Sequence, residues 1–471
     1  MKIVFIYKGR YQIRDTVTIE YLSAISKKYG HDTGLVFDQD VFGVTDNVAS
    51  IPFLNGLLSN SDKVLKGVVK KGPDMAVFLD GFNRGRWNGD MSGKIEGAGK
   101  GIIRVGIFYR DPGRAGKGYD YVLVGEPEYA FERFLSEKIF SSDKGSYKFK
   151  GLADLDAIPL PDKGLFAPFI DFGESYLLYT SKGCPYHCSY CEETIYKDIL
   201  GEGYFRRRSP ANVISELEEA KRRFGAREVI YKDSVFALDK EWLSSYLKAY
   251  KERISAPYKC FGKAEIFDDE LALMLKESGC YCVEFGVQTF NEALKKNILG
   301  REEKTGDLMK AFSACDRAGL RYDTDHMFGI PGERTEDHIK AAGVYADLKC
   351  LNRIKCHNLV YYKGAKIREH APRAVREDGE YRADFFSSVA GEGRMVETNY
   401  VFQKYYKTLP LLPKRFNLFI LKKNNWRIFK YVPYVLVVML MLILAIKNKD
   451  KRFKVYFNYY PKKIKHALAG Y

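Results

Sequence analysis

The sequence predicts an α/β protein: an N-terminal doubly wound, Rossmann-like parallel sheet, then a partial (β/α)6, TIM-like barrel, and finally a C-terminal helical tail that is both basic and apolar. Three observations predict this order. Residues 1–135 and 175–365 each alternate strand-like and helix-like segments. Three cysteines directly follow the first strand-like segment of the second series. Residues 403–471 carry 16 lysines and arginines but a single acid, Asp450.

Length and composition support several folded parts. A chain of 471 residues with 46% hydrophobic residues can bury sizeable cores in two or three domains. We predict a sheet domain at 1–150, a linker at 151–174 whose segment 153–164 contains two prolines, a barrel at 175–365 and a C-terminal region at 366–471. The cysteines are odd in number, and the N-terminus lacks the pattern of a secretory signal. Both features favour the reducing cytoplasm.

Five strand-like segments define the N-terminal sheet. They read KIVFIY, HDTGLVFD, DMAVFLDG, GIIRVGIFY and YDYVLVGEPE, and amphipathic segments lie between several of them. Ligands of doubly wound sheets bind at the carboxyl ends of the strands. The loops after Tyr7, Asp38 and Asp80 are therefore the expected site.

Six strands and their helices define the barrel. The strands are expected to begin near Ser175, Glu228, Tyr258, Tyr281, Arg321 and Arg353, with helices at 209–225, 240–253, 268–279, 291–298, 303–319 and 334–349. Ser209 is the expected N-cap of the first helix and Pro210 its first residue. Active sites of barrels lie at the carboxyl ends of the strands, which is where the cysteines follow SYLLYT.

The cysteines Cys184, Cys188 and Cys191 are spaced C-x3-C-x2-C. Three thiolates on a short loop can each hold one iron of a [4Fe–4S] cube and leave the fourth iron open. A structural zinc site would need a fourth ligand. His187 lies between two of the cysteines, where it could not readily coordinate the same metal, and we expect it to be a bystander. No catalytic residue beyond the cluster is assigned.

The segment CPYHCSYC resembles the cluster loop of radical S-adenosylmethionine (SAM) enzymes, with Tyr190 in the family's aromatic position. The resemblance covers residues 175–362. It implies a [4Fe–4S] cluster, SAM chelated to the open iron, and cleavage of SAM to a 5′-deoxyadenosyl radical. It also implies an electron donor such as flavodoxin or ferredoxin.

Three further segments resemble SAM-binding motifs of the family. Asp233 follows the second strand, where the family places contacts to the amino group of SAM, although a helix N-terminal Asp would look the same. VEFGVQTF places Glu284 and Gln288 near the ribose, and GIPGE places Gly329, Pro331 and Gly332 where backbone approaches the adenine. The remaining cysteines are expected to be buried and to pack as small hydrophobic residues, without an auxiliary cluster. Cys356, near the end of the sixth strand, is the one cysteine among them for which a functional role is kept as an alternative.

The N-terminal domain resembles the cobalamin-binding class of these enzymes. FDQDVFG places Asp38 and Gly43 at the class's loop positions, and VLVGEPEYAF resembles a second class segment. Asp40 stands where the cobalt-ligating histidine would be, which implies cobalamin without that ligand. FLDGFNRGRW lacks the usual Ser-x-Leu, and FYRDPGR replaces the usual Gly-Gly. A fold retained without cobalamin, with turn chemistry explaining Asp38 and Gly43, therefore stays an alternative.

The tail contains the uncharged run 431–446, with lysines and arginines on both sides. Sixteen helical residues span roughly 24 Å, less than the ~30 Å hydrocarbon core of a bilayer. We predict a peripheral or monotopic membrane attachment through 403–471, with a buried core helix or a tilted span as alternatives. Nucleic acid is not expected, because the aromatic residues of the tail lie mainly in or beside its apolar run rather than along a stacking platform.

Together these features predict a cobalamin-dependent radical SAM enzyme that transfers a methyl group to an unactivated carbon of a hydrophobic, lipid-like or membrane-associated substrate. One alternative is a radical SAM enzyme without cobalamin that rearranges, cyclises or oxidises its substrate. The other is a non-catalytic metal-binding protein that attaches to membranes or nucleic acid.

Overall fold

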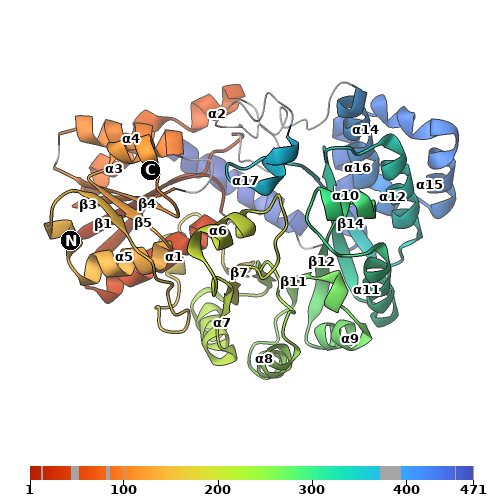
Figure 1. Cartoon of the computed structure of the whole chain (residues 1–471), viewed down its shortest axis with the longest axis horizontal. Helices are drawn as coiled ribbons and strands as arrows, with labels where there is room; N and C mark the ends of the chain where they lie inside the picture. Colours follow the sequence, from red (N-terminus) through yellow and green to blue (C-terminus); the bar gives the residue numbers. More distant parts are fainter. Residues whose placement is uncertain are drawn as a thin grey trace. The chain divides into compact units, whose positions relative to one another are not determined.

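A computed structural model describes residues 1–11, 14–43, 52–80, 85–99, 101–371, 394–450 and 452–469 (Figure 1). The chain forms two compact units. Unit 1 comprises Met1–Asp171, Tyr196–Arg206 and Phe457–Tyr471, and unit 2 comprises Phe172–Ile195 and Arg207–Tyr456. This division differs from the predicted one at the C-terminus, because the last residues cluster with the N-terminal sheet.

Unit 1 contains a six-stranded sheet in the order β2-β1-β3-β4-β5-β6, in which all neighbouring strands are parallel. Its strands are β1 (Lys2–Lys8), β2 (Asp32–Asp38), β3 (Met75–Asp80), β4 (Ile103–Phe108), β5 (Tyr121–Val124) and β6 (Gly145–Lys148). Its helices are α1 (Arg14–Lys28), α2 (Pro52–Leu58), α3 (Ser61–Lys71), α4 (Gly85–Gly97) and α5 (Pro127–Ser136), with 3-10 turns η1 (Gly113–Gly118), η2 (Ile139–Ser141) and η3 (Lys163–Leu165). The predicted doubly wound sheet is confirmed.

Alternating side chains of the sheet explain its two helical layers. Along β1, Val4 and Ile6 pack into a core with Val68 of α3, whereas Phe5 faces the opposite side and contacts Phe131 of α5. Each buried strand therefore needs an apolar layer on both faces, as in other parallel sheets. The strand order reverses between β1 and β3, and such a switch point is where doubly wound sheets bind ligands.

The predicted linker packs onto α1 of unit 1. Lys163 is buried and its ammonium lies 2.7 Å from the carboxylate of Glu20, which also accepts a hydrogen bond from Tyr11. Asp162 accepts a hydrogen bond from Ser23 at 2.7 Å. A buried ion pair with these extra hydrogen bonds fixes the linker in place.

The C-terminal helix α17 (Arg452–Ala469) also contributes to unit 1. Ala467 is buried against Val41 and Leu58, and the partly buried Ile464 joins them. The end of the basic tail therefore packs on the segments that follow β2.

Unit 2 contains a six-stranded parallel sheet in the order β14-β13-β12-β11-β10-β7. Its strands are β7 (Tyr176–Leu178), β10 (Val229–Tyr231), β11 (Tyr258–Gly262), β12 (Cys280–Gln288), β13 (Arg321–Phe328) and β14 (Leu351–Asn358). The helices between them are α7 (Pro210–Phe224), α8 (Lys240–Arg253), α9 (Asp269–Glu277), α10 (Glu292–Asn297), α11 (Thr305–Ala318) and α12 (Thr335–Asp347). The short strand β8 (Ser181–Lys182) and the turns η4 (Ala264–Ile266) and η5 (Lys366–His370) also belong to unit 2. Helix α6 (Glu192–Leu200) and the short strand β9 (Arg206–Arg207) each contain residues of both units.

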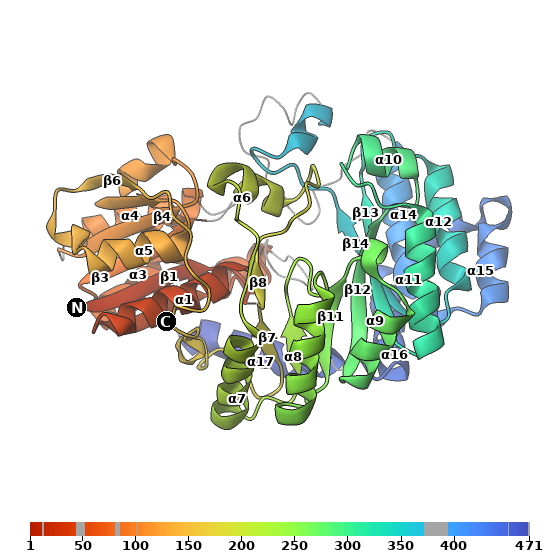
Figure 2. The ribbon, with the colours of Figure 1, turned by 60° about the horizontal axis from the view of Figure 1, so that its bottom comes forward.

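Figures 1 and 2 show α7, α8, α9, α11 and α12 around the outer side of this sheet. The sequential strand order is that of a partial barrel, so the predicted α/β class is confirmed. Local signals set the helix ends as expected: Ser209 caps α7 by accepting a hydrogen bond from the N–H of Asn212, and Gly225 ends it in the left-handed conformation.

Side chains of the barrel strands separate by face. On the outer face, Phe285 and Tyr322 pack against Phe312 of α11, with the rings of Phe312 and Tyr322 stacked 4.9 Å apart. On the inner face, the same strands present charged residues. The alternation follows from the two-residue period of a strand and places polar chemistry inside the barrel.

After the barrel come α14 (Arg394–Thr408), η6 (Leu409–Leu411), α15 (Lys414–Leu421), η7 (Lys422–Lys430) and α16 (Tyr434–Lys447). Within the described residues, no single helix has the length and hydropathy of a membrane span. The segments Lys414–Lys430 and Tyr434–Lys447 meet that criterion only as a pair, and they are bent by 120° relative to each other.

The substitution Lys163→Met should lower the free energy of unfolding of unit 1 by about 3–5 kcal/mol, because it leaves the Glu20 carboxylate buried without its cation. Lys27→Met removes an exposed lysine that pairs with Asp162 and should cost less than about 1 kcal/mol. Urea unfolding followed by circular dichroism measures both. Equal decreases in the free energy of unfolding of the two variants would show that the Lys163–Glu20 pair does not hold the linker.

Candidate active site

The three cysteines lie on one loop between β8 and α6. Their thiols are half-buried and form no disulfide. Gly183 begins the loop with φ of 90°, which a residue with a side chain rarely adopts. The carbonyl of Cys188 accepts hydrogen bonds from the N–H of Cys191 at 3.1 Å and from the hydroxyl of Thr194 at 2.9 Å. These hydrogen bonds fix the backbone of the loop from Cys188 to the start of α6.

A second loop, at residues 298–301, is hydrogen-bonded to the cluster loop at Ser189. The N–H of Ser189 donates to the carbonyl of Leu299 at 3.0 Å, and its hydroxyl donates to the carbonyl of Ile298 at 2.6 Å. A Cβ on Gly300 would lie 3.3 Å from the carbonyl oxygen of His187, so a glycine lets the two loops approach.

The three thiols are a donor set that fits an iron–sulfur cluster. Soft thiolates suit iron clusters, and a cube gives each thiolate its own iron. His187 lies on the same loop and is exposed, and its role as a bystander stays a prediction.

Asp233 lies directly after β10 and supports the start of the cluster loop. Its buried carboxylate accepts hydrogen bonds from the N–H of Thr180 at 2.9 Å, the hydroxyl of Thr180 at 2.7 Å and the hydroxyl of Ser181 at 2.6 Å. Burial raises the pKa of Asp233, and these hydrogen bonds partly offset the rise. No helix begins at Asp233, because Asp239 caps α8 instead. The contact of Asp233 with SAM stays a prediction.

Arg301 connects the cluster loop to the end of β12. Its guanidinium donates to the carbonyl of Gly286 at 2.8 Å and to the hydroxyl of Tyr190 at 3.3 Å, and it lies 3.0 Å from the carboxylate of Glu303. The Nε of Arg301 is buried and lacks a hydrogen-bond partner in the described part of the chain. The sequence analysis missed Arg301, because its contact with Tyr190 spans 111 positions.

Gln288 ends β12 in a strained conformation. Its φ is 61°, which is uncommon for a residue with a side chain, and the N–H of Thr289 donates across it to the carbonyl of Val287 at 2.8 Å. The side-chain amide lies over Gly286, where an added Cβ would be 2.9 Å from the Nε2 of Gln288. Such strain often marks a functional position.

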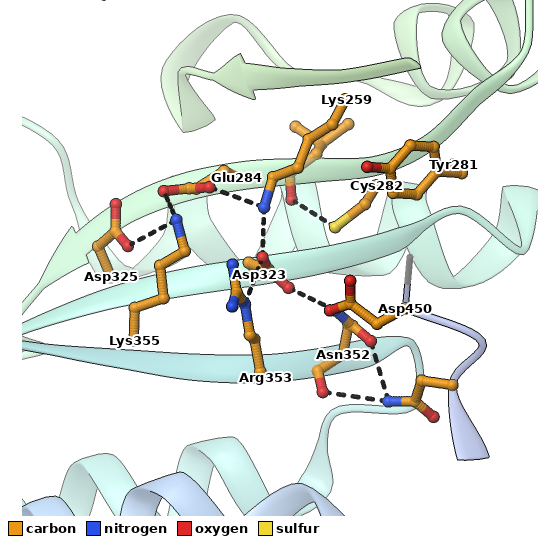
Figure 3. Close-up of polar contacts among 12 residues, drawn as sticks. Lys259, Tyr281, Cys282, Glu284, Asp323, Asp325, Asn352, Arg353, Lys355 and Asp450 are labelled. Atoms are coloured by element: carbon orange, nitrogen blue, oxygen red, sulfur yellow. Dashed lines mark hydrogen bonds and ion pairs between the residues drawn. The ribbon is translucent and has the colours of Figure 1, made fainter. Parts of the chain in front are cut away.

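Glu284 belongs to a charged network on the inner face of the barrel (Figure 3). Its carboxylate lies 2.7 Å from the ammonium of Lys259 and also pairs with Lys355. Lys259 pairs in addition with Asp323, which accepts a hydrogen bond from Arg353 at 2.8 Å. Burial alone would raise the pKa of Glu284, but Lys259 and Lys355 hold that pKa well below its usual range. Glu284 is therefore anionic and already bound by two lysines.

The segment Gly329–Glu333 forms a tight turn after β13. Gly329 and Gly332, on either side of Ile330 and Pro331, have φ of 83° and 84°, so both glycines are required by the backbone. The N–H of Gly329 donates to the carboxyl of Glu333 at 2.7 Å, and Asn399 of α14 donates to the same oxygen. Burial raises the pKa of Glu333 to about 7. The sequence analysis assigned no role to Glu333.

The cysteines outside the loop are protected thiols. Cys260, Cys280, Cys282 and Cys315 are buried, and burial raises the pKa of Cys260, Cys282 and Cys315. The Sγ of Cys356 contacts the carbonyl of Gln403 at 3.8 Å, and burial raises its pKa to about 12. Cys356 therefore stays a neutral thiol that faces α14.

The predicted cofactor loop of unit 1 follows β2. Asp38 accepts hydrogen bonds from Ser59 at 2.6 Å and from the N–H of Asp40 at 3.0 Å. Asp40 lies 3.4 Å from the ammonium of Lys8, and a Cβ on Gly43 would lie 2.1 Å from an Asp40 oxygen. Local packing alone therefore explains a glycine at 43. The described loops at this edge carry no histidine, so the donor set fits cobalamin only without a protein ligand to cobalt.

The predicted SAM contacts thus fall into connected groups in unit 2. Arg301 bonds both to Tyr190 and to the carbonyl of Gly286, two residues before Gln288, and Asp233 is bonded to the start of the cluster loop. Glu284 lies in the charged network, and Gly329, Pro331 and Gly332 form the turn that Glu333 closes. Asp38 and Gly43 belong to unit 1.

Glu333→Gln should remove one pH dependence of stability. The carboxyl titrates near 7 when folded and near 4.3 when unfolded, so the stability it contributes is full below about pH 4.3 and is lost as the pH rises through 7. The variant cannot ionise, and its unfolding midpoint should exceed that of the wild type by on the order of 5–10 °C at pH 8 and match it at pH 4. Thermal unfolding at both pH values is the measurement. Glu336→Gln, at an exposed position, is the control. If the unfolding midpoint changed with pH equally in Glu333→Gln and in the wild type, this account would be contradicted.

Comparison with known proteins identifies the barrel. Residues 178–343 match the Radical SAM superfamily. An uncharacterized methyltransferase of Pyrococcus horikoshii is 24% identical over 54% of this chain and 58% of its own length. The cytidylyl-2-hydroxyethylphosphonate methyltransferase of Streptomyces wedmorensis is 26% identical over 51% of this chain and 47% of its own length. The chain thus spans about half the length of these curated relatives.

A solved structure shares the fold of most of the chain. The cobalamin-dependent S-adenosylmethionine radical enzyme OxsB, with aqua-cobalamin and S-adenosylmethionine bound, matches 99% of this chain and 83% of its own, with a TM-score of 0.59 at 11% identity. The family predicted from the cysteine loop is confirmed. Residues 178–343 of this chain therefore form a radical SAM domain, and the fold of the chain resembles that of OxsB.

Proposed function

We propose that this chain is a cobalamin-dependent radical SAM methyltransferase that acts on an unactivated carbon. The observation that carries the proposal is the loop of three half-buried thiols at the carboxyl end of the first barrel strand, in a chain that also contains a complete doubly wound sheet. The methyltransferase names of the relatives and the cobalamin in the OxsB structure support it.

The bound groups would supply the difficult chemistry. The cluster would provide an electron, SAM would provide the radical, and cobalamin would carry the methyl group. The chain holds and orients them. Cys184, Cys188 and Cys191 would bind three irons of the cluster and leave the fourth accessible to SAM. An electron donor such as flavodoxin or ferredoxin would reduce the cluster.

Arg301 would orient SAM beside the cluster. Its Nε is a buried donor without a hydrogen-bond partner in the described residues, and its guanidinium touches both the cluster loop and the end of β12. A buried donor of this kind strongly favours an anionic acceptor. The carboxylate of SAM is an acceptor of matching charge, and Gln288 at the strained end of β12 would contact the ribose.

The inner face of the barrel would face the substrate of the proposed reaction. The ammonium groups of Lys232 and Lys355 lie 5.6 Å and 5.9 Å from the centroid of the Phe261 ring, and Lys355 is also paired with Glu284. The tail favours a hydrophobic, lipid-like substrate, whereas the relative from Streptomyces wedmorensis is named for a phosphonate substrate.

One observation favours the alternative without cobalamin. Ile464 and Ala467 of α17 pack on Val41 and Leu58, next to the loop that would meet cobalamin. In that alternative unit 1 is a retained fold, and the barrel abstracts hydrogen and rearranges, cyclises or oxidises its substrate.

Anaerobic reconstitution of the full chain tests the proposal. We expect four irons, four sulfides and one cobalt per chain, with 5′-deoxyadenosine and S-adenosylhomocysteine formed from SAM under reduction. Iron and 5′-deoxyadenosine without cobalt or S-adenosylhomocysteine would support the alternative. Absence of iron and of SAM cleavage would refute both.

The variants Cys184→Ala, Cys188→Ala and Cys191→Ala should each lower 5′-deoxyadenosine formation by at least about 1,000-fold, because two thiolates on this loop leave a second iron unligated. Cys350→Ala also removes a half-buried thiol, but one outside the loop, and should retain activity. Circular dichroism checks that the folds are equal. Activity near the wild-type level in any loop variant would exclude the proposed cluster.

A further inference from the structure

Three segments after the barrel each bury one apolar face against the rest of unit 2. In η7, Trp426 stacks on Phe402 of α14 with ring centroids 4.6 Å apart, and Phe429 contacts Tyr405 at 5.1 Å. In α15, Asn417 and Ile420 are buried. In α16, Val437 and Leu444 are buried, two helical turns apart on one side of the helix. These inner faces account for the attachment of the segments to α14 and α12.

The opposite faces of the same segments are also apolar. We call them the outward apolar surface, which consists of Phe416, Leu418, Phe419, Ile428, Tyr431, Tyr434, Val435, Leu436, Val438, Met439, Ile443 and Ile446. Val435 is 72% exposed and Tyr431 is 79% exposed. A helix on the surface of a soluble protein normally turns a polar face to water. An exposed apolar surface of this extent indicates a binding partner.

Basic residues flank the outward apolar surface in the sequence, and two of them, Lys414 and Lys430, pair with Asp347 and Glu397. Between Glu397 and Asp450 the sequence contains no Asp or Glu. Its lysines and arginines include Lys422 and Arg427 of η7 and Lys447 at the end of α16, all of which are exposed. The partner should therefore combine apolar groups with negative charge.

A buried lysine holds the bend between η7 and α16. The ammonium of Lys404, on α14, donates to the carbonyls of Phe429, Lys430 and Val432 at 3.2, 3.3 and 2.8 Å. These carbonyls belong to the junction at which the two segments turn by 120°. The bend is therefore built into the fold, and α16 lies against α14 instead of continuing the direction of η7.

The far end of α16 is attached to the barrel itself. The side chain of Asn448 donates to the carbonyl and side-chain oxygens of Asn352 at 3.1 and 2.9 Å, and Arg321 donates to the carbonyl of Asn448. Asn352 and Arg321 lie at the amino ends of β14 and β13. The outward apolar surface is thus a fixed part of unit 2.

From these contacts we propose that the outward apolar surface lies on the surface of a bilayer that contains anionic lipids. The fourteen residues of α16 span about 21 Å and cannot cross a ~30 Å hydrocarbon core, whereas they can lie in its interface. A second copy of this chain fits less well, because pairing the same surface would bring two basic rims together. The inference stands independently of the proposed methyl transfer.

Co-flotation of the full-length, cluster-loaded protein with lipid vesicles tests the proposal. The vesicles contain phosphatidylcholine alone or with 30% phosphatidylglycerol, at low and high salt. Wild type should bind the anionic vesicles, and binding should weaken at high salt. Val435→Glu with Met439→Glu places two acids on the exposed side of α16 and should reduce binding at least tenfold.

The double variant Lys422→Gln with Arg427→Gln should bind anionic vesicles about 25-fold more weakly at low salt, because each lost charge reduces the affinity about fivefold. Its binding to phosphatidylcholine vesicles should be unchanged. Leu273→Glu, which replaces a 51% exposed leucine of α9, is the matched control and should bind as wild type does. Formation of 5′-deoxyadenosine should stay unchanged in all these variants, which separates lipid binding from the proposed chemistry. Wild type that fails to bind, α16 variants that bind equally well, or a wild-type dimer that these variants dissociate would each overturn the proposal.

Discussion

Three hydrogen-bond donors converge on the buried carboxylate of Asp233, and the position of the cluster loop depends on them. They come from Thr180 and Ser181, the residues between the first barrel strand and the cysteines. The contact joins two neighbouring parallel strands at their carboxyl ends. On the other side, the turn at Leu299 and Gly300 fixes Ser189. The cluster loop is therefore held by hydrogen bonds at two places, at Thr180 and Ser181 and at Ser189.

The separation of the two faces of the barrel sheet determines what the interior can do. The outer face is aromatic and packs on helices, so the strands are rigid. The inner face carries Lys259, Glu284, Asp323 and Arg353, which are paired with one another. Paired charges keep fixed positions, and such preorganisation suits chemistry on a reactive radical.

Local patterns predicted most of the fold. The barrel helices begin and end within a few residues of their expected limits, because capping residues such as Ser209 and Gly225 can be recognised from the sequence alone. Helix α4 was missed because glycine stands at every fourth position from Gly85 to Gly97, which is unfavourable for a helix by propensity alone. The packing of Lys163 on Glu20 and of α17 on Val41 was also missed, since these contacts join distant parts of the chain.

The site was predictable only where one short segment carries the chemistry. Cys184, Cys188 and Cys191 are recognisable by spacing, and the glycines at 329 and 332 by the turn they allow. Arg301 and Glu333 have no local signature, because their importance comes from contacts with Tyr190 and Asn399. Asp233 was found, but its hydrogen bonds to Thr180 and Ser181 could not be read from sequence.

The uneven burial of the thiols bears on how the protein acquires its iron. Burial keeps Cys260, Cys282 and Cys315 protonated, whereas the three loop cysteines are only partly buried. An assembly machinery that delivers iron and sulfide would meet three partly buried thiols together on this loop, whereas the partly buried Cys350 lies outside it.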